Sequence, residues 1–102
     1  MSRTVEAIPV GISMDGQLAA AAQLMVIGKV GLLGGDGTLE QYRGRGLQQR
    51  LIRGRVGMAA GRGLEWVHAE VVDGSGSHRN YERCGFHKLY ERIHYIKRFA
   101  EN

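Results

Sequence analysis

The sequence predicts a single α+β domain with a mixed sheet, and three features lead to this prediction. β-like apolar runs separated by the turns Asp15-Gly16 and Gly28-Lys29 fill the first third of the chain. A strand, a glycine turn, a helical pattern and another strand follow between residues 30 and 72, as in a βαβ unit with parallel strands. An alternating run closes the chain. We therefore expect a mostly antiparallel sheet with a central parallel pair and two helices.

The length and charge limit the function classes. The chain of 102 residues fits one small domain over residues 1–102. Between Gln41 and Gly63 it carries six arginines and no acid, a field that attracts anionic ligands or nucleic acid. Its aromatic residues are few and do not interleave with these arginines, so nucleic acid is the weaker expectation.

Cysteine and histidine usage point to a reducing compartment, and we expect a cytoplasmic protein. Cys84 is the only cysteine, which rules out an intrachain disulfide and a cysteine metal cluster. The histidines show no metal-ligand spacing, so no metal is expected. We recognise no signal peptide, and the apolar run 18–33 contains Gln23 and Lys29, which favours two buried strands over a membrane span.

Three strands are expected first. Residues 5–13 form a strand in which Pro9 favours an edge position. Residues 17–27 are assigned to a strand because short turns flank them, although their four alanines favour a helix by propensity. Residues 30–39 form a strand whose glycines mark a bulge or the close approach of a ligand: Gly34, Gly35 and Gly37.

A helix is expected over residues 45–62, ended by Gly61 or Gly63. Its inward stripe is expected at Leu47, Leu51, Gly54 and Met58, widened by Ile52, Val56 and Ala59. Four arginines are expected mostly on the solvated face of this helix: Arg50, Arg53, Arg55 and Arg62.

The remaining elements are a strand over 64–72, a short helix over 77–84 and a last strand over 87–99. Gly85 is the expected residue after the short helix, where glycine is favoured. In the last strand, alternation is expected to turn odd-numbered apolar residues inward: Leu89, Ile93, Tyr95 and Phe99.

The stretch from Thr38 to Arg53 predicts an anion site. A strand that feeds a glycine turn at the start of a helix presents several backbone N–H groups at the positive end of the helix dipole. No segment has the Walker pattern, and the dinucleotide fingerprint fails because its third glycine position holds Gln49. A diphosphate held by main-chain amides beside arginines fits, and a solvated surface turn fits equally well.

Two short motifs resemble the GNAT superfamily of acetyl-CoA-dependent N-acetyltransferases. Residues 41–46, QYRGRG, resemble its [Q/R]-x-x-G-x-[G/A] motif. Residues 81–86, YERCGF, resemble its Y-E-[K/R]-x-G-F signature, and residues 75–80, SGSHRN, resemble the S-x-S-x-R-N segment that precedes it. The resemblance covers about residues 28–99 and places the motifs in the superfamily's order.

The resemblance implies that the two central parallel strands part where acetyl-CoA inserts. The pantetheine arm would lie between the strand ending near Leu39 and strand 64–72, and the pyrophosphate would lie on the amides of residues 43–47. The implied cofactor-binding residues are Leu39, Gln41, Tyr42, Arg43, Gly44, Arg45, Gly46, Leu47, Gln48, Ser77 and Asn80.

The implied reaction is direct attack of a primary amine on the acetyl thioester. Tyr81 matches the superfamily's general acid, and a phenol with a pKa near 10 can share a proton with a thiolate whose conjugate thiol has a pKa of about 8.5. A packing role for Tyr81 and a surface role for Asn80 are the alternatives. Glu40 is the acid nearest the parted strands and the first candidate for the base, ahead of Glu70 and His68, although an ion pair with an arginine is the commoner role. Cys84 is expected to pack.

Members of that superfamily carry one or two further helices before the first strand found here, and those shape the acceptor site. The short length fits a fragment, a natural short form completed by another subunit, or a form that binds cofactor without turnover. An uncovered sheet face would favour a homodimer. The alternative function is a non-catalytic anion- or nucleic-acid-binding module that uses the basic patch Arg43–Arg62.

Overall fold

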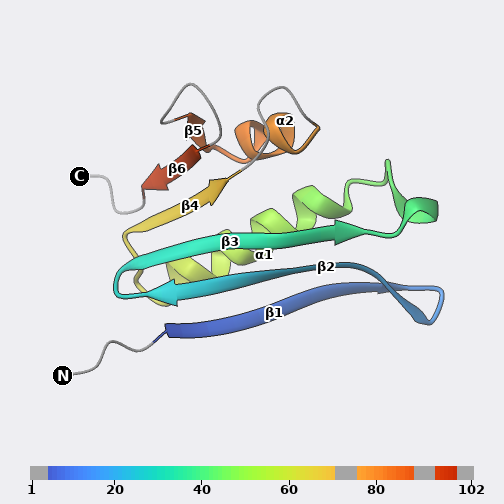
Figure 1. Cartoon of the computed structure of the whole chain (residues 1–102), viewed down its shortest axis with the longest axis horizontal. Helices are drawn as coiled ribbons and strands as arrows, with labels where there is room; N and C mark the ends of the chain where they lie inside the picture. Colours follow the sequence, from blue (N-terminus) through green and yellow to red (C-terminus); the bar gives the residue numbers. More distant parts are fainter. Residues whose placement is uncertain (1–4, 71–75, 89–93, 99–102) are drawn as a thin grey trace.

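The computed structural model describes residues 5–70, 76–88 and 94–98. In this part of the chain six strands form one sheet in the order β1-β2-β3-β4-β6-β5 (Figure 1). The β3–β4 pair is parallel and the other neighbouring pairs are antiparallel. The predicted fold class is therefore confirmed. The strands are β1 (Val5–Met14), β2 (Gln17–Ile27), β3 (Val30–Thr38), β4 (Trp66–Glu70), β5 (His87–Lys88) and β6 (His94–Arg98).

The first three strands form a meander closed by the two predicted turns. Asp15 and Gly16 both adopt positive φ angles, 53° and 77°, as a two-residue hairpin turn requires. Gly28 opens the second turn with a φ of 60°. Pro9 lies in β1 at the edge of the sheet, as predicted for a proline within a strand.

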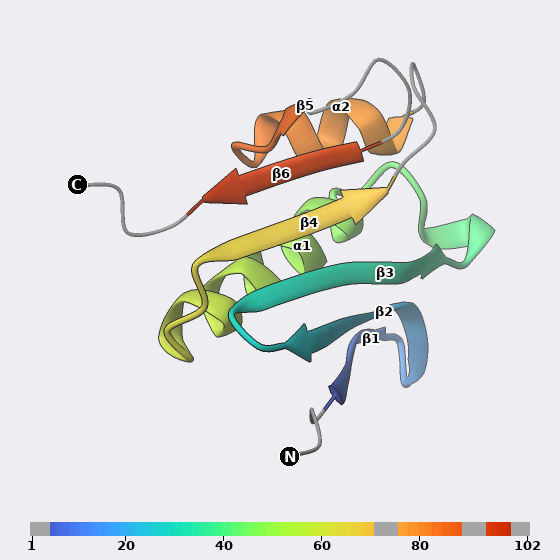
Figure 2. The ribbon, with the colours of Figure 1, turned by 60° about the vertical axis from the view of Figure 1, so that its left-hand side comes forward.

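Strand β3, helix α1 (Leu47–Gly61) and strand β4 make the predicted βαβ unit. Helix α1 and the shorter α2 (Gly76–Arg83) lie on the same face of the sheet, as Figure 2 shows. The core is formed where both helices meet the central strands. Its fully or nearly fully buried members include Leu24, Leu33, Ile52, Ala59, Val67, Tyr81 and Phe86.

The inward face of α1 differs from the predicted stripe. Arg55 is completely buried, whereas Gly54 is exposed and a Cβ added to it would meet nothing within 4 Å. The buried positions advance by four, one, three and four residues, which is also a helical stripe: Leu47, Leu51, Ile52, Arg55 and Ala59. The prediction failed because an arginine was assumed to face water, and this one has buried partners.

The predicted single strand over 87–99 is wrong. Strands β5 and β6 are two antiparallel partners, with His87 opposite Ile96 and Lys88 opposite Tyr95. Period-2 alternation is the same in both strands, so it cannot reveal that the chain reverses between them. The inward positions assigned to Leu89, Ile93 and Phe99 lie outside the described residues.

Candidate functional site

The far half of β3 has no partner on its β4 side among the described residues. The two strands pair in parallel only from Val30 to Leu33, opposite Trp66 to Ala69. In the described part of the chain β4 ends at Glu70, whereas β3 continues to Thr38. The backbone of residues 34–38 therefore has no ladder partner in β4 among the described residues. The continuation of strand 64–72 past Glu70 lies outside the described residues, so the predicted parting of the central strands stays a prediction.

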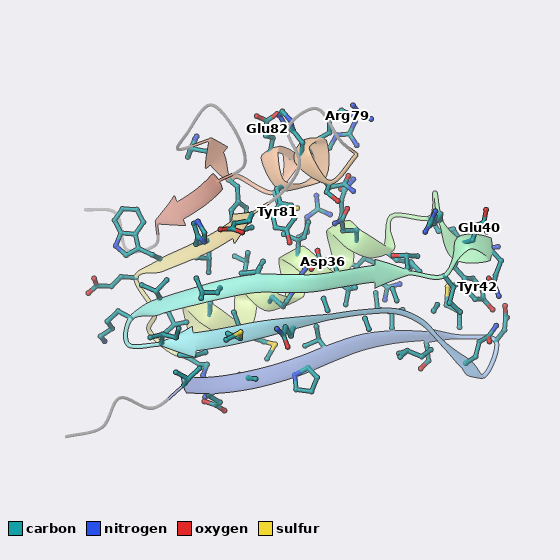
Figure 3. The ribbon with its side chains drawn as sticks, viewed as in Figure 1. Asp36, Glu40, Tyr42, Arg79, Tyr81 and Glu82 are labelled. Carbon is teal, nitrogen blue, oxygen red and sulfur yellow. The ribbon has the colours of Figure 1, made fainter. Side chains whose placement is uncertain are left out.

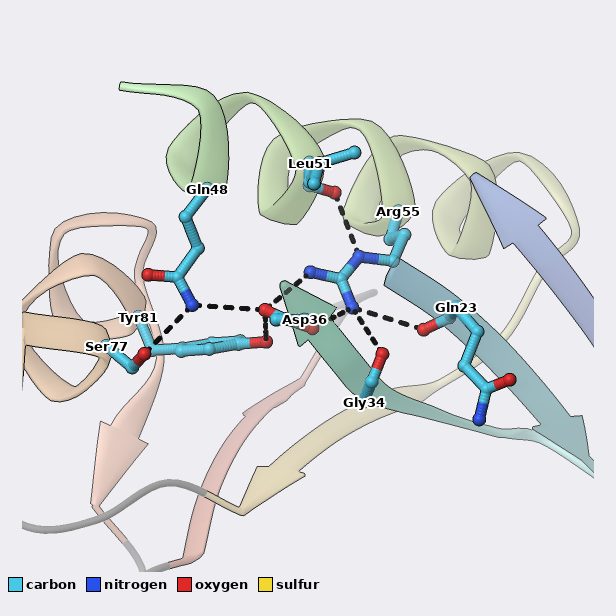
Figure 4. A network of polar contacts seen from close by, with 8 residues as sticks. All are labelled: Gln23, Gly34, Asp36, Gln48, Leu51, Arg55, Ser77 and Tyr81. Atoms are coloured by element: carbon cyan, nitrogen blue, oxygen red, sulfur yellow. Dashed lines mark hydrogen bonds and ion pairs between the residues drawn. The ribbon is translucent and has the colours of Figure 1, made fainter. Parts of the chain in front are cut away.

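A bulge lies in this half of β3, on its β2 side. Gln23 pairs with Gly34 and Ala21 with Gly37, so two residues of β3 stand opposite one of β2. Gly35 takes a φ of +68°, which strongly favours glycine. The second residue of the bulge is Asp36, whose side chain turns toward the two helices (Figure 4).

The glycine turn after β3 leaves a series of backbone donors at the start of α1. A short 3-10 helix, η1 (Glu40–Tyr42), follows Leu39, and the amide of Arg43 is used internally by the carbonyl of Glu40 at 3.2 Å. The first helical bond runs from Arg50 N–H to Gly46 O. Among the described residues, the amides of residues 44–49 have no backbone acceptor, as expected for a helix N-terminus. The amides without a backbone acceptor are therefore those of residues 44–49, whereas the prediction placed the anion on the amides of residues 43–47.

Two glycines give the turn its shape. Gly44 and Gly46 take φ angles of 80° and 75°, and Gly46 is the N-cap of α1 in the left-handed conformation. A Cβ at either position would meet nothing within 4 Å. The backbone is therefore exposed to an approaching ligand at both positions.

A cleft of about 690 Å³ opens between the end of β3, the glycine turn and the N-termini of α1 and α2. Most of the predicted cofactor-binding residues line it, whereas Leu39, Gln41 and Arg45 are not among its lining residues. The predicted residues that line it are Tyr42, Arg43, Gly44, Gly46, Leu47, Gln48, Ser77 and Asn80. The cleft has further lining residues that the motifs did not predict: Asp36, Gly37, Thr38, Gln49, Leu51, Gly76 and Arg83.

Side-chain amides join the two helices across the cleft. Gln48 Nε2 donates to Ser77 Oγ at 3.0 Å, and Gln48 Oε1 accepts from Asn80 Nδ2 at 2.7 Å. Gln49 Nε2 donates to Asn80 Oδ1 at 3.1 Å. Ser77 and Asn80 therefore hold α2 against α1, in addition to any contact that they make with a ligand.

Tyr42 has a packing role in this structure. Its side chain is 4% exposed, and its hydroxyl lies 3.0 Å from Asp15 Oδ2, to which it donates, while accepting from Gln17 Nε2 at 3.0 Å. The guanidinium of Arg45 lies 5.3 Å from the centre of the tyrosine ring. These contacts attach the glycine turn to the β1–β2 hairpin.

A buried polar network connects β3 with both helices (Figure 4). Arg55 Nη1 and Nη2 donate to the two carboxylate oxygens of Asp36 at 2.9 and 3.0 Å. Arg55 also donates to the carbonyls of Leu51, Gln23 and Gly34. The guanidinium is fully buried, and the Asp36 side chain is 16% exposed. This arginine is buried because its acceptors are buried with it.

Tyr81 completes the network from α2. Its hydroxyl donates to Asp36 Oδ2 at 2.8 Å, and its ring meets Phe86 edge-to-face at a centroid distance of 5.1 Å. Burial, and then the nearby charge of Asp36, raise the pKa of Tyr81 well above that of an ordinary tyrosine. Tyr81 is 2% exposed and is not among the residues lining the cleft, whereas Asp36 is.

The three candidates for a base lie apart from this network. Glu40 is exposed on η1, away from Tyr81 (Figure 3), and does not line the cleft. His68 lies on β4 between Val67 and Ala69, whose side chains are in the core with Tyr81. Because side chains alternate along a strand, His68 faces the other side of the sheet. Glu70 is exposed at the end of β4.

Two further classes of site receive no support from the described residues. No group of three or more histidine, cysteine, aspartate or glutamate side chains in residues 5–70, 76–88 and 94–98 is arranged to hold a metal ion. In the same ranges, no helix has the length and apolar character needed to cross a membrane.

The raised pKa of Tyr81 gives the stability a pH dependence. The folded state holds the phenolic proton more tightly than the unfolded chain, in which a tyrosine ionises near pH 10. The stabilisation is therefore fully present below about pH 10 and is lost as pH rises above it. We expect the difference in unfolding free energy between wild type and Tyr81→Phe to shrink from pH 9 to pH 11 in urea titrations. A difference that stays constant over this range would contradict the burial of an ionisable phenol.

Solved structures of acetyltransferases share this fold. Ribosomal-protein-S18-alanine N-acetyltransferase from Escherichia coli aligns with a TM-score of 0.83 and 18% identity, covering 94% of this chain and 71% of that chain. PaiA N-acetyltransferase from Thermoplasma acidophilum, in complex with coenzyme A, aligns with a TM-score of 0.80 and 14% identity over 92% of this chain and 62% of that chain. A GNAT-family acetyltransferase from Staphylococcus aureus Mu50 aligns with a TM-score of 0.75 and 11% identity, covering 87% of this chain and 65% of that chain.

The chain therefore has the GNAT acetyltransferase fold. No protein-family model matches the sequence, and no curated protein matches it. The identities to the solved structures are low, so the likeness establishes the architecture, and the chemistry has to be argued from the site itself.

Proposed function

We propose that this protein binds acetyl-CoA in the cleft and transfers its acetyl group to a primary amine. The observation that carries the proposal is a row of amides at the start of α1 that have no backbone acceptor among the described residues, beside the far half of β3, which has no described partner in β4. A ligand that has a diphosphate and an amide-containing arm can use both. The same fold in a coenzyme A complex, that of the Thermoplasma acidophilum acetyltransferase, supports this ligand class.

The residues present fit the ligand in two ways. The amides of residues 44–49 lack backbone acceptors in the described structure, and an anion at a helix N-terminus would satisfy several of them. The exposed backbone of Gly44 and Gly46 allows a phosphate to approach, and Arg43 lines the same cleft. The pantetheine arm would follow β3 at residues 34–38, whose backbone has no described partner in β4. Its amides would form hydrogen bonds with this backbone.

Bound acetyl-CoA would supply an activated thioester that an amine can attack directly. In the proposed reaction Tyr81 gives its phenolic proton to the departing sulfur, so an O–H bond breaks as an S–H bond forms. The base that takes the proton from the amine remains a prediction. Glu40 was the first candidate, and its exposed position away from Tyr81 offers no support for that role.

The alternative, a binding module that uses the basic patch Arg43–Arg62, loses part of its charge to internal pairs. Arg55 is neutralised by Asp36 inside the protein, and Arg62 pairs with Glu6. Four of the six arginines of the patch then remain to attract an anion: Arg43, Arg45, Arg50 and Arg53. The cleft is the more specific feature of this surface.

The proposal predicts that acetyl-CoA binding depends on the two turn glycines. We expect the double variant Gly44→Glu, Gly46→Glu to bind acetyl-CoA at least about 100-fold more weakly by calorimetry, because opposing like charges costs several kcal/mol. Both positions have positive φ, so any side chain there strains the backbone. The matched control is therefore Gly44→Ala, Gly46→Ala, which introduces the same strain without charge and should bind more tightly than the glutamate variant.

Two results of this experiment would count against the proposal. If the wild-type chain shows no saturable binding of acetyl-CoA, the proposed cofactor is wrong. If the alanine and glutamate variants bind equally, the negative charge has no effect and the diphosphate is not at the turn. Salt-sensitive RNA binding by a wild-type chain without cofactor affinity would favour the alternative.

We also propose that the protein forms the predicted homodimer. It rests on a sheet whose two described helices lie on one face (Figure 2). A light-scattering mass of two chains at micromolar concentration is expected, and a mass of one chain would contradict it.

A further inference from the structure

We propose that Asp36 is the positioning residue of the site: its carboxylate fixes the position of the Tyr81 hydroxyl. This inference rests on the proposed function, because it assigns a role within the same cleft. It goes beyond that function by naming a residue that neither sequence motif contains, at the bulge of β3.

The carboxylate of Asp36 already has donors on both oxygens. Oδ1 accepts from Arg55 Nη1 at 2.9 Å. Oδ2 accepts from Arg55 Nη2 at 3.0 Å, from Gln48 Nε2 at 3.1 Å and from the Tyr81 hydroxyl at 2.8 Å. A carboxylate with four donors has little acceptor capacity left for the proton of an incoming amine. The contacts therefore favour an anchor over a general base.

The anchor also connects the buried acid with the cleft. Tyr81 is 2% exposed and does not line the cleft, whereas Asp36 and Gln48 do. The hydroxyl of Tyr81 consequently lies one hydrogen bond behind the cleft wall, with its proton directed at the carboxylate. The contact fixes the position of the phenol oxygen beside the cleft, and the O–H bond has to turn from the carboxylate toward the sulfur when the thioester binds.

The charges of the network hold the proton on the phenol. A negative carboxylate in contact with the phenol opposes formation of a tyrosinate, so Tyr81 gives up its proton less readily than an ordinary tyrosine. Arg55 is fully buried and balances the charge of Asp36. Its two donors fix the orientation of the carboxylate group. Helix α1 contributes Gln48 and Arg55, helix α2 contributes Tyr81, and the bulge of β3 contributes Asp36, so the three elements are positioned together.

The test compares Asp36→Asn with wild type in acetyl transfer and in proton NMR. An asparagine keeps the shape of the side chain, removes the charge and places an N–H₂ donor at one of the two positions where the carboxylate accepts, which disrupts the network that holds Tyr81. We expect kcat to fall about 10- to 100-fold while the KM for acetyl-CoA changes less than about threefold, because misorientation costs rate rather than binding. The alkaline limb of the kcat profile should move to lower pH, since the phenol ionises more easily beside a neutral amide.

The NMR measurement does not depend on catalytic activity. In wild type the Tyr81 hydroxyl proton should give a slowly exchanging, low-field resonance that disappears in Tyr81→Phe and moves or is lost in Asp36→Asn. Tyr42→Phe is the matched control, because Tyr42 is equally buried and donates to Asp15, so it should leave this resonance in place. The wild-type and Tyr81→Phe spectra test the hydrogen bond between Tyr81 and Asp36 even if Asp36→Asn, which leaves Arg55 unpaired, does not fold.

The outcomes separate the two proposals. A wild-type chain that binds no acetyl-CoA overturns the proposed function, and the role of Asp36 falls with it. A wild-type chain that turns over, together with an Asp36→Asn variant that has the same kcat and the same alkaline limb, overturns only the positioning role. Rapid exchange of the Tyr81 hydroxyl proton in wild type overturns it as well.

Discussion

Replacing Arg55 by methionine should lower the free energy of unfolding by about 3–5 kcal/mol, because removing one partner leaves a mostly buried carboxylate unpaired. Asp36 would lose both guanidinium bonds, and the carbonyls of Gln23 and Gly34 would lose a donor. For a chain of this size each kcal/mol corresponds to about 4–8 °C in melting temperature. Thermal and urea unfolding followed by circular dichroism should therefore show a large shift.

The control for this experiment lies on the same helix. Arg53 is exposed, so Arg53→Met should change stability by less than about 0.5 kcal/mol. The double variant Asp36→Asn, Arg55→Met should be more stable than the sum of its single changes predicts, by about 1–3 kcal/mol, because the two residues are in contact. An Arg55→Met protein as stable as the Arg53→Met protein would mean that the buried pair does not form.

The architecture could be predicted from the sequence because it depends on local signals that add up along the chain. The turns at Asp15-Gly16 and Gly28-Lys29 require positive φ angles, and apolar runs on either side of them leave few arrangements other than a hairpin. The glycine turn that precedes α1 was found because it needs glycines at fixed positions. Gly44 and Gly46 both carry the positive φ that such a turn uses.

The polar network could not be predicted in the same way, because its members come from distant parts of the chain. Asp36, Arg55 and Tyr81 are brought together by the βαβ crossover and by the return of α2, not by their spacing. Two signals were nevertheless present. Asp36 is the only acid within the glycine-rich strand 30–38, and Arg55 is four residues after Leu51 on the buried stripe of α1. Charge was assumed to indicate exposure, and the burial of these two residues shows why that assumption fails when opposite charges meet.

Replacing Tyr81 by phenylalanine should slow acetyl transfer more than any other change of a single atom in this protein. If the phenol gives its proton to the departing sulfur, its removal should lower kcat by about 10²- to 10⁴-fold, the usual contribution of a general acid. The KM for acetyl-CoA should change little, because Tyr81 does not line the cleft in which the cofactor is proposed to bind. Steady-state kinetics with a primary amine as acceptor measure both quantities.

The structure also predicts the pH range over which Tyr81 can act. Burial and the charge of Asp36 raise the pKa of Tyr81, so the phenol should remain protonated at pH values where an ordinary tyrosine, with a pKa of about 10, ionises. Loss of this acid should therefore not limit the wild-type rate below about pH 10.

Cys84→Ala is the matched control for Tyr81→Phe on the same segment. Cys84 packs against the core outside the cleft, and its removal should leave kcat within about twofold, as expected for a direct attack without a cysteine nucleophile. A Tyr81→Phe variant with the wild-type kcat, or a Cys84→Ala variant without activity, would contradict this assignment of the acid.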